Sequence, residues 1–240
     1  MTSALKLRPW QWNLRVRLAW ALLFFRGSAE ELSTMANHIL QSYRVQTSDL
    51  AGAKVCRDRF HVLSIAARKV RAIPGLALEF GVFKGTTLKH IATEIGPTRQ
   101  VVGFDTFEGL PEDWGDLLPK GTFATKVPSF EAYSNIDVEA GRIEDTLPVF
   151  LEKKRQSIAL VHIDCPYYEI NVFILDRLLP FMPDRSIVVF DEYYGYPSYE
   201  DHEFRAWTEI RTRARLVASP LAYSSRSAAF EISRNPRYSL

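Results

Sequence analysis

Residues 76–85 read LALEFGVFKG, a short apolar run that reaches an acid and then passes through two glycines. Gly81 and Gly85 let the backbone turn sharply and leave room for a ligand that a side chain would exclude. The helical pattern TTLKHIATEIG follows, and a second apolar run, VVGFD, ends at Asp105. This order of strand, glycine turn, helix and strand is typical of the first half of a fold that binds a nucleotide or a nucleoside.

The rest of the chain continues this alternation, which predicts a mostly parallel α/β sheet with helices on both faces. We expect seven strands, at residues 76–80, 101–105, 137–140, 158–164, 186–191, 216–218 and 228–232. The helices between them are expected at residues 86–95, 145–154, 168–179 and 199–213. Ligands collect at the carboxyl ends of the strands in such sheets. Four of the runs carry an acid there: Glu79, Asp105, Asp164 and Asp191.

The first 74 residues are predicted to form a helical extension packed on a Rossmann-like domain at residues 75–240. Ser28 and Glu31 form the S-x-x-E capping pattern, so a helix is expected to begin there. Apolar residues recur at three- and four-residue spacing between residues 58 and 73, which predicts a second helix. The Pro-Gly pair at residues 74–75 ends that helix before the first strand.

The beginning of the chain carries five basic side chains around the apolar run at residues 18–25: Lys6, Arg8, Arg15, Arg17 and Arg26. That run is shorter than the roughly 20 residues needed to span a bilayer, so no transmembrane segment is expected. A signal peptide matches the pattern only loosely. The alternatives are an amphipathic helix used for packing, for dimerisation or for peripheral membrane contact. Packing is the interpretation we favour.

The composition, with 47% hydrophobic and 24% charged residues among 240, fits one large folded domain. A formal net charge of +2, with 30 basic and 28 acidic residues interspersed, gives no basic patch for nucleic acid. Cys56 and Cys165 lie far apart, which favours buried free thiols in a reducing compartment and hence a cytoplasmic location. The expected partner is therefore a small molecule, and neither a metal knuckle nor a disulfide framework is predicted.

The spacing of the glycine turn separates two kinds of nucleotide site. A dinucleotide-binding dehydrogenase would show G-x-G-x-x-G, whereas this chain reads Gly81-Val82-Phe83-Lys84-Gly85. A single nucleoside therefore fits better than a pyrophosphate. Asp105, about 20 residues further on, is placed to accept hydrogen bonds from ribose hydroxyls. The alternatives are close helix–strand packing for the glycines and a helix cap or Asx turn for Asp105.

Several segments occur in an order that resembles a known family: EFGVFKG, GFDTFEGLPEDW, GRIEDTLP, HIDCPYY, and VVFDEYYGYP with HEFRAW. Together they resemble class I S-adenosylmethionine-dependent methyltransferases of the macrocin O-methyltransferase (TylF-like) family. The resemblance implies a Rossmann-like sheet of seven strands and S-adenosyl-L-methionine as cofactor. It also implies methyl transfer to a hydroxyl of a small molecule, with a sugar of a glycosylated natural product as the favoured acceptor. A homo-oligomer is expected.

The resemblance also implies a set of cofactor-binding residues. The first turn would hold the methionine part with Glu79, Gly81, Val82, Phe83, Lys84, Gly85 and Thr86. Asp105 would take the ribose hydroxyls, beside Thr106 and Phe107. The adenine would lie at Gly141, Arg142 and Ile143, and Asp164 would lie near the cofactor as well. Loop packing is the alternative role for each of these residues.

The acids Asp164, Asp191 and Glu192 resemble the family's divalent metal site, and carboxylate oxygens at adjacent strand ends suit Mg²⁺. A hydroxyl bound to the metal would lose its proton more readily. Asp164 is the expected catalytic base, with His162 as an alternative that titrates near neutral pH. Our preferred reading of His162 is a histidine satisfied inside a buried strand. Pro166 departs from the family, which often carries a second acid at that place.

The acceptor is expected to meet aromatic and polar side chains around this site: Tyr167, Tyr193, Tyr194 and His202. Core or interface packing is the alternative for the tyrosines. Residues 107–128, rich in Gly and Pro, are expected to form a lid. Two further functions stay open at this point. Because of Pro166, the chain could bind the cofactor with weak or no methyl transfer, and a nucleotide-dependent oxidoreductase is the other alternative.

Overall fold

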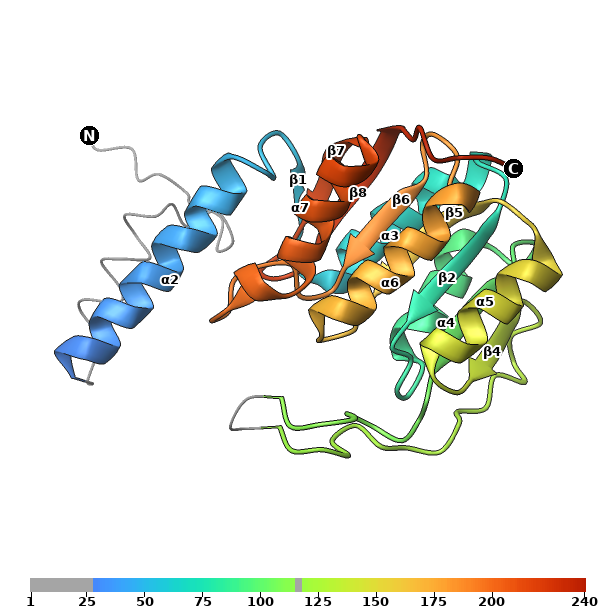
Figure 1. Ribbon diagram of the computed structural model, residues 1–240, viewed down its shortest axis with the longest axis horizontal. Helices are drawn as coiled ribbons and strands as arrows, with labels where there is room; N and C mark the ends of the chain where they lie inside the picture. Colours follow the sequence, from blue (N-terminus) through green and yellow to red (C-terminus); the bar gives the residue numbers. More distant parts are fainter. Residues whose placement is uncertain (1–27, 115–117) are drawn as a thin grey trace, which may run out of the picture.

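The computed structural model describes residues 28–114 and 118–240, which build a twisted sheet between two layers of helices (Figure 1). The strands are β1 (Lys54–Val55), β2 (Leu76–Phe80), β3 (Val101–Asp105), β4 (Ile136–Ala140), β5 (Ile158–Ile163), β6 (Ile187–Phe190), β7 (Val217–Tyr223) and β8 (Ala228–Arg234). Their spatial order is β1-β7-β8-β6-β5-β2-β3-β4. All neighbours pair in parallel except β8, which runs antiparallel to both β6 and β7.

The predicted fold class is confirmed, and the strand number differs by one. The described residues contain eight strands where the sequence predicted seven. The additional strand is β1, in which Lys54 and Val55 pair with Ala222 and Tyr223 of β7. A two-residue strand has no room for an alternating apolar pattern, so periodicity does not reveal it.

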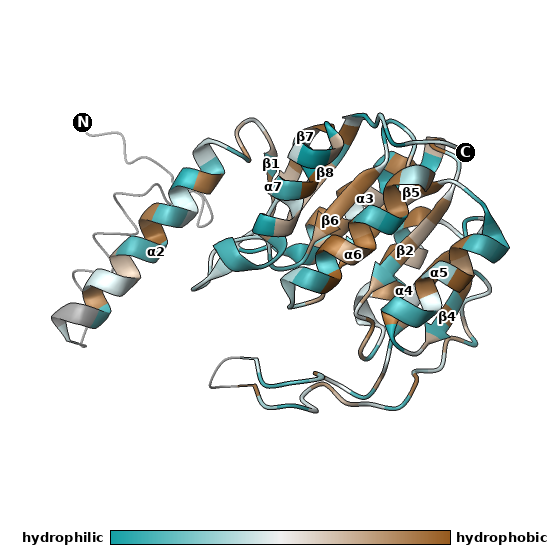
Figure 2. Cartoon of the chain, viewed as in Figure 1, coloured by the Kyte–Doolittle hydropathy of each residue, from teal (hydrophilic) through white to brown (hydrophobic). Residues whose placement is uncertain are grey.

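The helices are α2 (Ala29–Thr47), α3 (Arg59–Lys69), α4 (Thr86–Ile95), α5 (Ile143–Lys154), α6 (Tyr168–Leu178) and α7 (Glu203–Ala214). Short 3-10 turns lie at Val70–Ala72, Leu179–Phe181 and Tyr199–Asp201. Helices α3 and α4 cover one face of the sheet, and α5, α6 and α7 cover the other. Figure 2 shows that hydrophobic residues are concentrated on the central strands, as expected for a sheet buried on both faces. None of the helices in the described part has the length and apolar character that a membrane crossing requires.

Helix α2 begins where the sequence predicted. Glu31 N donates to Ser28 Oγ at 3.2 Å and Ser28 N donates to Glu31 Oε2 at 2.7 Å, which completes a capping box. Figure 1 shows α2 projecting beyond the sheet, and Val45 and Leu50 are buried against the core at its attached end. The basic segment at residues 1–27, with its proposed packing or membrane contact, lies outside the described residues.

Residues 54–74 are part of the sheet and its helical cover. Strand β1 extends the sheet, and α3 packs on β6, β7 and β8. The division into an extension at 1–74 and a domain at 75–240 stays a prediction. Cys56 and Cys165 are both buried free thiols.

Candidate active site

The candidate site lies where the carboxyl ends of the central parallel strands meet. Glu79 of β2 pairs with His162 of β5, and His162 pairs with Val189 of β6. The acids that follow these positions are therefore brought to one edge of the sheet. Figure 1 shows the long segment between β3 and β4 running past this edge. This is the edge at which open α/β sheets bind ligands.

The turn after β2 is as sharp as the sequence predicted. Gly81 has a φ of +90° and Gly85, which caps α4, has a φ of +71°. A Cβ at Gly81 would overlap the backbone oxygen of Asp164, and one at Gly85 would lie 2.6 Å from the ring of Phe130. Glycine is therefore required at both positions because Asp164 packs against the backbone of Gly81 and Phe130 packs against that of Gly85. The turn is thereby fixed against the end of β5.

Asp105 holds this turn in place. Its Oδ2 accepts hydrogen bonds from the backbone N–H groups of Val82 at 2.8 Å and Phe83 at 2.7 Å. Its Oδ1 accepts one from Phe107 N at 2.8 Å. A carboxylate offers about four lone-pair positions, so Asp105 keeps one for a further donor. The ribose contact stays a prediction, while the role in shaping the turn is observed.

The other residues expected at the cofactor fall into a buried group and an accessible group. The side chains of Val82, Phe107 and Ile143 are buried in the core, so only their backbone can face a ligand. This corrects the expectation for their side chains. Accessible at the turn and the two following loops are Phe83, Lys84, Thr86, Thr106 and Arg142. Gly141 donates its N–H to the backbone oxygen of Asp105 at 3.0 Å, which brings the third loop beside the second.

Glu79 and His162 form a fully buried pair. Both side chains have 0% of their surface exposed, and His162 Nδ1 lies 2.9 Å from Glu79 Oε2. Thr87 Oγ1 donates to Glu79 Oε1 at 3.1 Å. Glu79 therefore cannot contact a cofactor directly. The sequence-based expectation for it is corrected, because its carboxylate is used inside the protein.

His162 is a cation in this setting. Burial acts to lower its pKa, but the bonding to Asp191 and Glu79 and their negative charges outweigh burial and raise the pKa to about 10. A general base must be unprotonated at working pH and must reach the substrate. His162 meets neither condition, so its assignment as an alternative base is wrong. The preferred interpretation from the sequence, a histidine satisfied inside a buried strand, agrees with the burial of His162 and with the bond of Nδ1 to Glu79, whereas Nε2 lies 3.5 Å from Asp191 Oδ1.

Asp164 and Asp191 face a residue that sequence reasoning missed, Arg59. Its Nη1 lies 2.8 Å from Asp191 Oδ2 and 3.9 Å from Asp164 Oδ2. Burial and the charge of Asp191 raise the pKa of Asp164. Although burial opposes it, the pKa of Asp191 is lowered by the hydrogen bond and charge of His162 and by Arg59. Asp191 therefore keeps its negative charge more readily than Asp164, and Asp164 is the better proton acceptor.

A sequence signal for Arg59 exists. It is the first residue of α3, directly after the N-cap Asp58, and the first turn of that helix contains no acid. A positive side chain is disfavoured at a helix N-terminus by the helix dipole, so an arginine there suggests an acidic partner elsewhere. The identity of that partner depends on how α3 packs on the sheet, which the sequence does not reveal.

The predicted magnesium site does not fit this donor set. Glu192 is paired with Arg226, whose Nη1 lies 2.9 Å from Glu192 Oε1. Asp191 is paired with Arg59 and lies beside the protonated His162. Among residues 28–114 and 118–240, no group of three or more acidic, histidine or cysteine side chains is arranged to hold a metal ion. Asp164, Asp191 and Glu192 are thus not brought together as metal ligands.

Two of the four residues expected at the acceptor are core residues. Tyr193 and Tyr194 are fully buried. The Tyr193 hydroxyl donates to Asp49, and the Tyr194 hydroxyl donates to the backbone oxygen of Ser224. Because their hydroxyl groups are used internally, the acceptor role assigned to them from the sequence is wrong. Although Tyr193 and Tyr194 follow Asp191 closely in the sequence, their side chains do not line the surface of the site.

Tyr167 and His202 lie against the segment that follows β3. Tyr167 donates its hydroxyl to the backbone oxygen of Glu112 at 3.0 Å. The His202 ring stacks on Tyr196 with centroids 6.2 Å apart and meets Trp114 edge-on at 6.1 Å. Trp114, Tyr196 and His202 form an aromatic cluster that connects this segment to the start of α7. The expected lid segment therefore contacts the expected acceptor residues.

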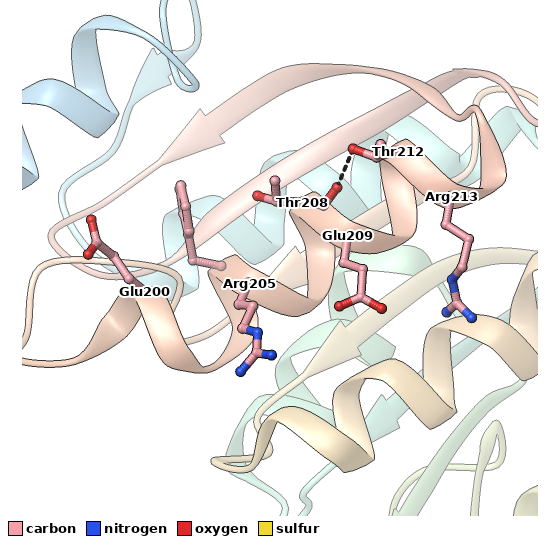
Figure 3. A pocket seen from close by; sticks show the side chains of 7 residues that line it. Glu200, Arg205, Thr208, Glu209, Thr212 and Arg213 are labelled. Carbon is pink, nitrogen blue, oxygen red and sulfur yellow. Dashed lines mark hydrogen bonds between the residues drawn. The ribbon is translucent and has the colours of Figure 1, made fainter.

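A separate surface hollow lies along α7 and is not part of this site. Figure 3 shows Arg205, Glu209 and Arg213 pointing from α7 toward α6. These side chains pair with α6: Tyr168 donates to Glu209, and Arg213 Nη2 lies 2.6 Å from Asp176 Oδ2. The hollow contains none of the residues at the carboxyl ends of β2, β3, β5 and β6.

Comparison with known proteins agrees with this architecture. A family model described as a methyltransferase domain matches residues 78–193. The crystal structure of CalS11, a calicheamicin methyltransferase, is 24% identical, covers 93% of each chain and has a TM-score of 0.60. An apo structure of CalS11, described as a TDP-rhamnose 3'-O-methyltransferase, is 24% identical with a TM-score of 0.54, covering 91% of this chain and 92% of that one.

A third solved structure extends the comparison. The O-methyltransferase from Bacillus cereus in complex with SAH is 13% identical, covers 92% of this chain and 97% of that one, and has a TM-score of 0.52. No curated protein matches the chain in sequence. At these identities the solved structures show the fold.

The fold is that of the class I methyltransferases. Together with the methyltransferase-domain match over residues 78–193, this fold supports the prediction of an S-adenosylmethionine-dependent methyltransferase. This outcome does not favour the nucleotide-dependent oxidoreductase that the sequence left open.

Proposed function

We propose that this methyltransferase transfers a methyl group to a hydroxyl of a small molecule, and that Asp164 is the catalytic base. One observation carries the proposal: the glycine turn and Asp164 are in direct contact, because the backbone oxygen of Asp164 occupies the space where Gly81 would carry a Cβ. The residues expected at the methionine end of the cofactor thus lie beside a carboxylate that can accept a proton.

The residues of the turn fit the methyl donor. Asp105 fixes the backbone of Val82 and Phe83, and the accessible residues around it are polar or aromatic. S-adenosyl-L-methionine would supply a methyl group activated by the charge of its sulfonium. The chain's own contribution would be to hold the donor between the turn and the loop at Gly141 and Arg142, and to exclude water from it.

Asp164 has the properties of a general base. Its side chain is 37% exposed, so a hydroxyl can reach it. Its raised pKa brings its proton affinity closer to that of a base working near neutral pH. With the donor bound, a carboxylate oxygen of Asp164 would accept the hydroxyl proton as the acceptor oxygen takes the methyl group, and the donor would leave as a neutral thioether.

A sugar hydroxyl on a glycosylated natural product is the acceptor class that we propose. The cluster of Trp114, Tyr196 and His202 offers ring faces beside polar groups, which suits the apolar faces and hydroxyls of a sugar. The similar fold of CalS11, described as a TDP-rhamnose 3'-O-methyltransferase, supports the same class. Membership in the macrocin type, a cytoplasmic location and a homo-oligomer are parts of this proposal.

The test compares wild type with Asp164→Asn in a methyl-transfer assay on a panel of sugar nucleotides and glycosides. The substitution keeps the shape of the side chain and removes its basicity, so kcat should fall by about 10²- to 10⁴-fold. S-adenosylhomocysteine affinity, measured by calorimetry, should change little. Full activity of Asp164→Asn would exclude Asp164 as the base. Tight S-adenosylhomocysteine binding without transfer to any acceptor would favour a binding protein with no turnover.

A further inference from the structure

The guanidinium of Arg59 lies between the two acids expected to bind metal. Arg59 Nη1 is 2.8 Å from Asp191 Oδ2 and 3.9 Å from Asp164 Oδ2. We propose that Arg59 is the resident cation of this site and positions both carboxylates, so that methyl transfer by this protein needs no divalent metal. This inference rests on the proposed function, and its main test does not require turnover.

The acids at the site already have partners inside the protein. Arg59 faces Asp191, Asp164 and, further away, Glu79. His162 lies 2.9 Å from Glu79 Oε2 and 3.5 Å from Asp191 Oδ1, and both His162 and Glu79 are fully buried. A divalent cation added between Asp164 and Asp191 would therefore meet the positive charge of Arg59.

Arg59 already occupies one carboxylate oxygen of Asp191. Magnesium binds carboxylate oxygens at about 2.0–2.1 Å and demands near-octahedral coordination. Asp191 Oδ2 is hydrogen-bonded to Arg59 Nη1, and only 8% of the Asp191 side chain is exposed. Binding of an ion at that oxygen would require Arg59 to leave.

Further ligands are also missing. Glu192 is held by Arg226 at 2.9 Å. His162 is fully buried, and its Nδ1 lies 2.9 Å from Glu79 Oε2. Pro166 has no side-chain donor. Two independent features, an arginine between the acids and a proline beside them, therefore point to the same outcome.

The position of Arg59 is well fixed by α3. Asp58 Oδ1 accepts from His61 N at 2.9 Å and caps the helix. The next turn anchors the helix on the sheet through Val62 and Leu63, both fully buried. The guanidinium of an arginine has several N–H donors in a fixed plane, so at the start of a well-anchored helix it can lie between two carboxylates. A lysine has a single ammonium group on a flexible side chain and is less suited to this role. We therefore assign Arg59 as a positioning residue.

The first test measures Mn²⁺ binding by electron paramagnetic resonance, with Mn²⁺ as a probe for Mg²⁺. Wild type should show no binding at millimolar Mn²⁺. Arg59→Ala should gain one weak site, because it leaves Asp164 and Asp191 without their cation while Glu192 and Pro166 still supply no further ligand. Arg57→Ala is the matched control: it removes the same charge two residues earlier, from a side chain that is 84% exposed and points to Asp58, and should behave as wild type.

One result of this test would overturn the proposal: a Mn²⁺ site in wild type that disappears in Asp191→Asn. Gain of the site in both arginine variants would also overturn it, because a general loss of positive charge would then be the cause. Circular dichroism and S-adenosylhomocysteine binding check that the variants fold. If Arg59→Ala does not fold, the wild-type titration alone still decides whether a metal binds.

The second test is methyl transfer with and without chelator. Wild-type kcat should stay within about twofold after EDTA treatment, since no metal supplies the charge. Arg59→Ala should lose about tenfold or more in kcat, and Arg59→Lys should recover part of the loss through its single charge. Loss of wild-type activity in EDTA that Mg²⁺ restores would overturn the proposal. If no acceptor is methylated at all, the proposed function fails, and the Mn²⁺ result still stands.

Discussion

His162 shows how neighbouring side chains decide the chemistry of one residue. From the sequence it is a histidine in an apolar strand, and its ordinary pKa of 6.5 would make it a candidate base. In the structure Glu79 and Asp191 lie on its two ring nitrogens and raise its pKa to about 10. Its function is then to carry a buried positive charge that orders two acids.

The protonation of His162 can be observed directly. Nitrogen NMR of labelled protein should show both ring nitrogens protonated at pH 8. Because the folded pKa lies above the unfolded value, the stability that His162 contributes is fully present below about pH 6.5. It is lost as the pH rises through about 10. Urea unfolding at several pH values measures that loss.

Glu79→Gln provides the control for His162. It removes the nearer negative charge while keeping the shape, so the pKa of His162 should fall and the high-pH loss of stability should begin earlier. A neutral His162 at pH 8 in wild type would contradict the assignment and would return it to the list of possible bases.

Single residues at strand ends were predictable, and their partners were not. Asp105, Asp164 and Asp191 were located from the sequence because each closes an apolar run, and parallel strands end at one edge. Arg59 was missed because its role depends on how α3 packs on the sheet. Its partner Asp191 lies 132 residues later in the sequence. Tyr193 was misassigned for the same reason, because its hydrogen-bond partner Asp49 lies 144 residues earlier in the sequence.

At the scale of elements, the turn between β2 and α4 depends on a glycine that touches another strand. Gly81→Ala would force a side chain into φ +90° and against the backbone of Asp164. We expect a loss of about 3 kcal/mol or more in the free energy of unfolding, because conformational strain and overlap add. Cofactor affinity should fall as well, since β5 must shift. Urea unfolding and calorimetry measure both effects.

Gly52→Ala separates the two contributions. Gly52 has a similar φ of +81°, but nothing lies within 4 Å of the added Cβ. This variant should lose only about 1–2 kcal/mol, the cost of the backbone conformation. Equal losses for the two variants would show that contact with Asp164 contributes nothing to the stability of the turn.

The sequence predicts those helices and strands that are long enough to show a periodic pattern of apolar residues. Helix α2 begins at the capping box, and α3 begins after the N-cap Asp58. Strand β1 was missed because two residues carry no periodicity, and its pairing with β7 depends on a contact over more than 160 residues. Local patterns thus predict where elements lie, while edge strands depend on the completed sheet.

For the whole molecule, the alternation of strands and helices was sufficient to predict the doubly covered sheet. The order of the strands, with β8 inserted antiparallel between β6 and β7, agrees with the class I methyltransferase fold. The contacts between the segment after β3 and the start of α7 were less predictable. They bring Trp114 beside His202, 6.1 Å apart between ring centroids, and depend on how the loop folds back.

Ligand binding should stabilise the whole molecule, because the turn, Asp105 and the loop at Gly141 all belong to one cooperative sheet. S-adenosylhomocysteine at 100 times its Kd should add about 2.7 kcal/mol to the free energy of unfolding. For a chain of this size that raises Tm by roughly 5–10 °C in a calorimetric scan. Asp105→Asn, which replaces an accepting oxygen by an amide donor, should lose most of this shift at the same concentration. NAD⁺ should leave Tm unchanged, and a rise with NAD⁺ but not with S-adenosylhomocysteine would refute the assignment of the methyl donor to this turn.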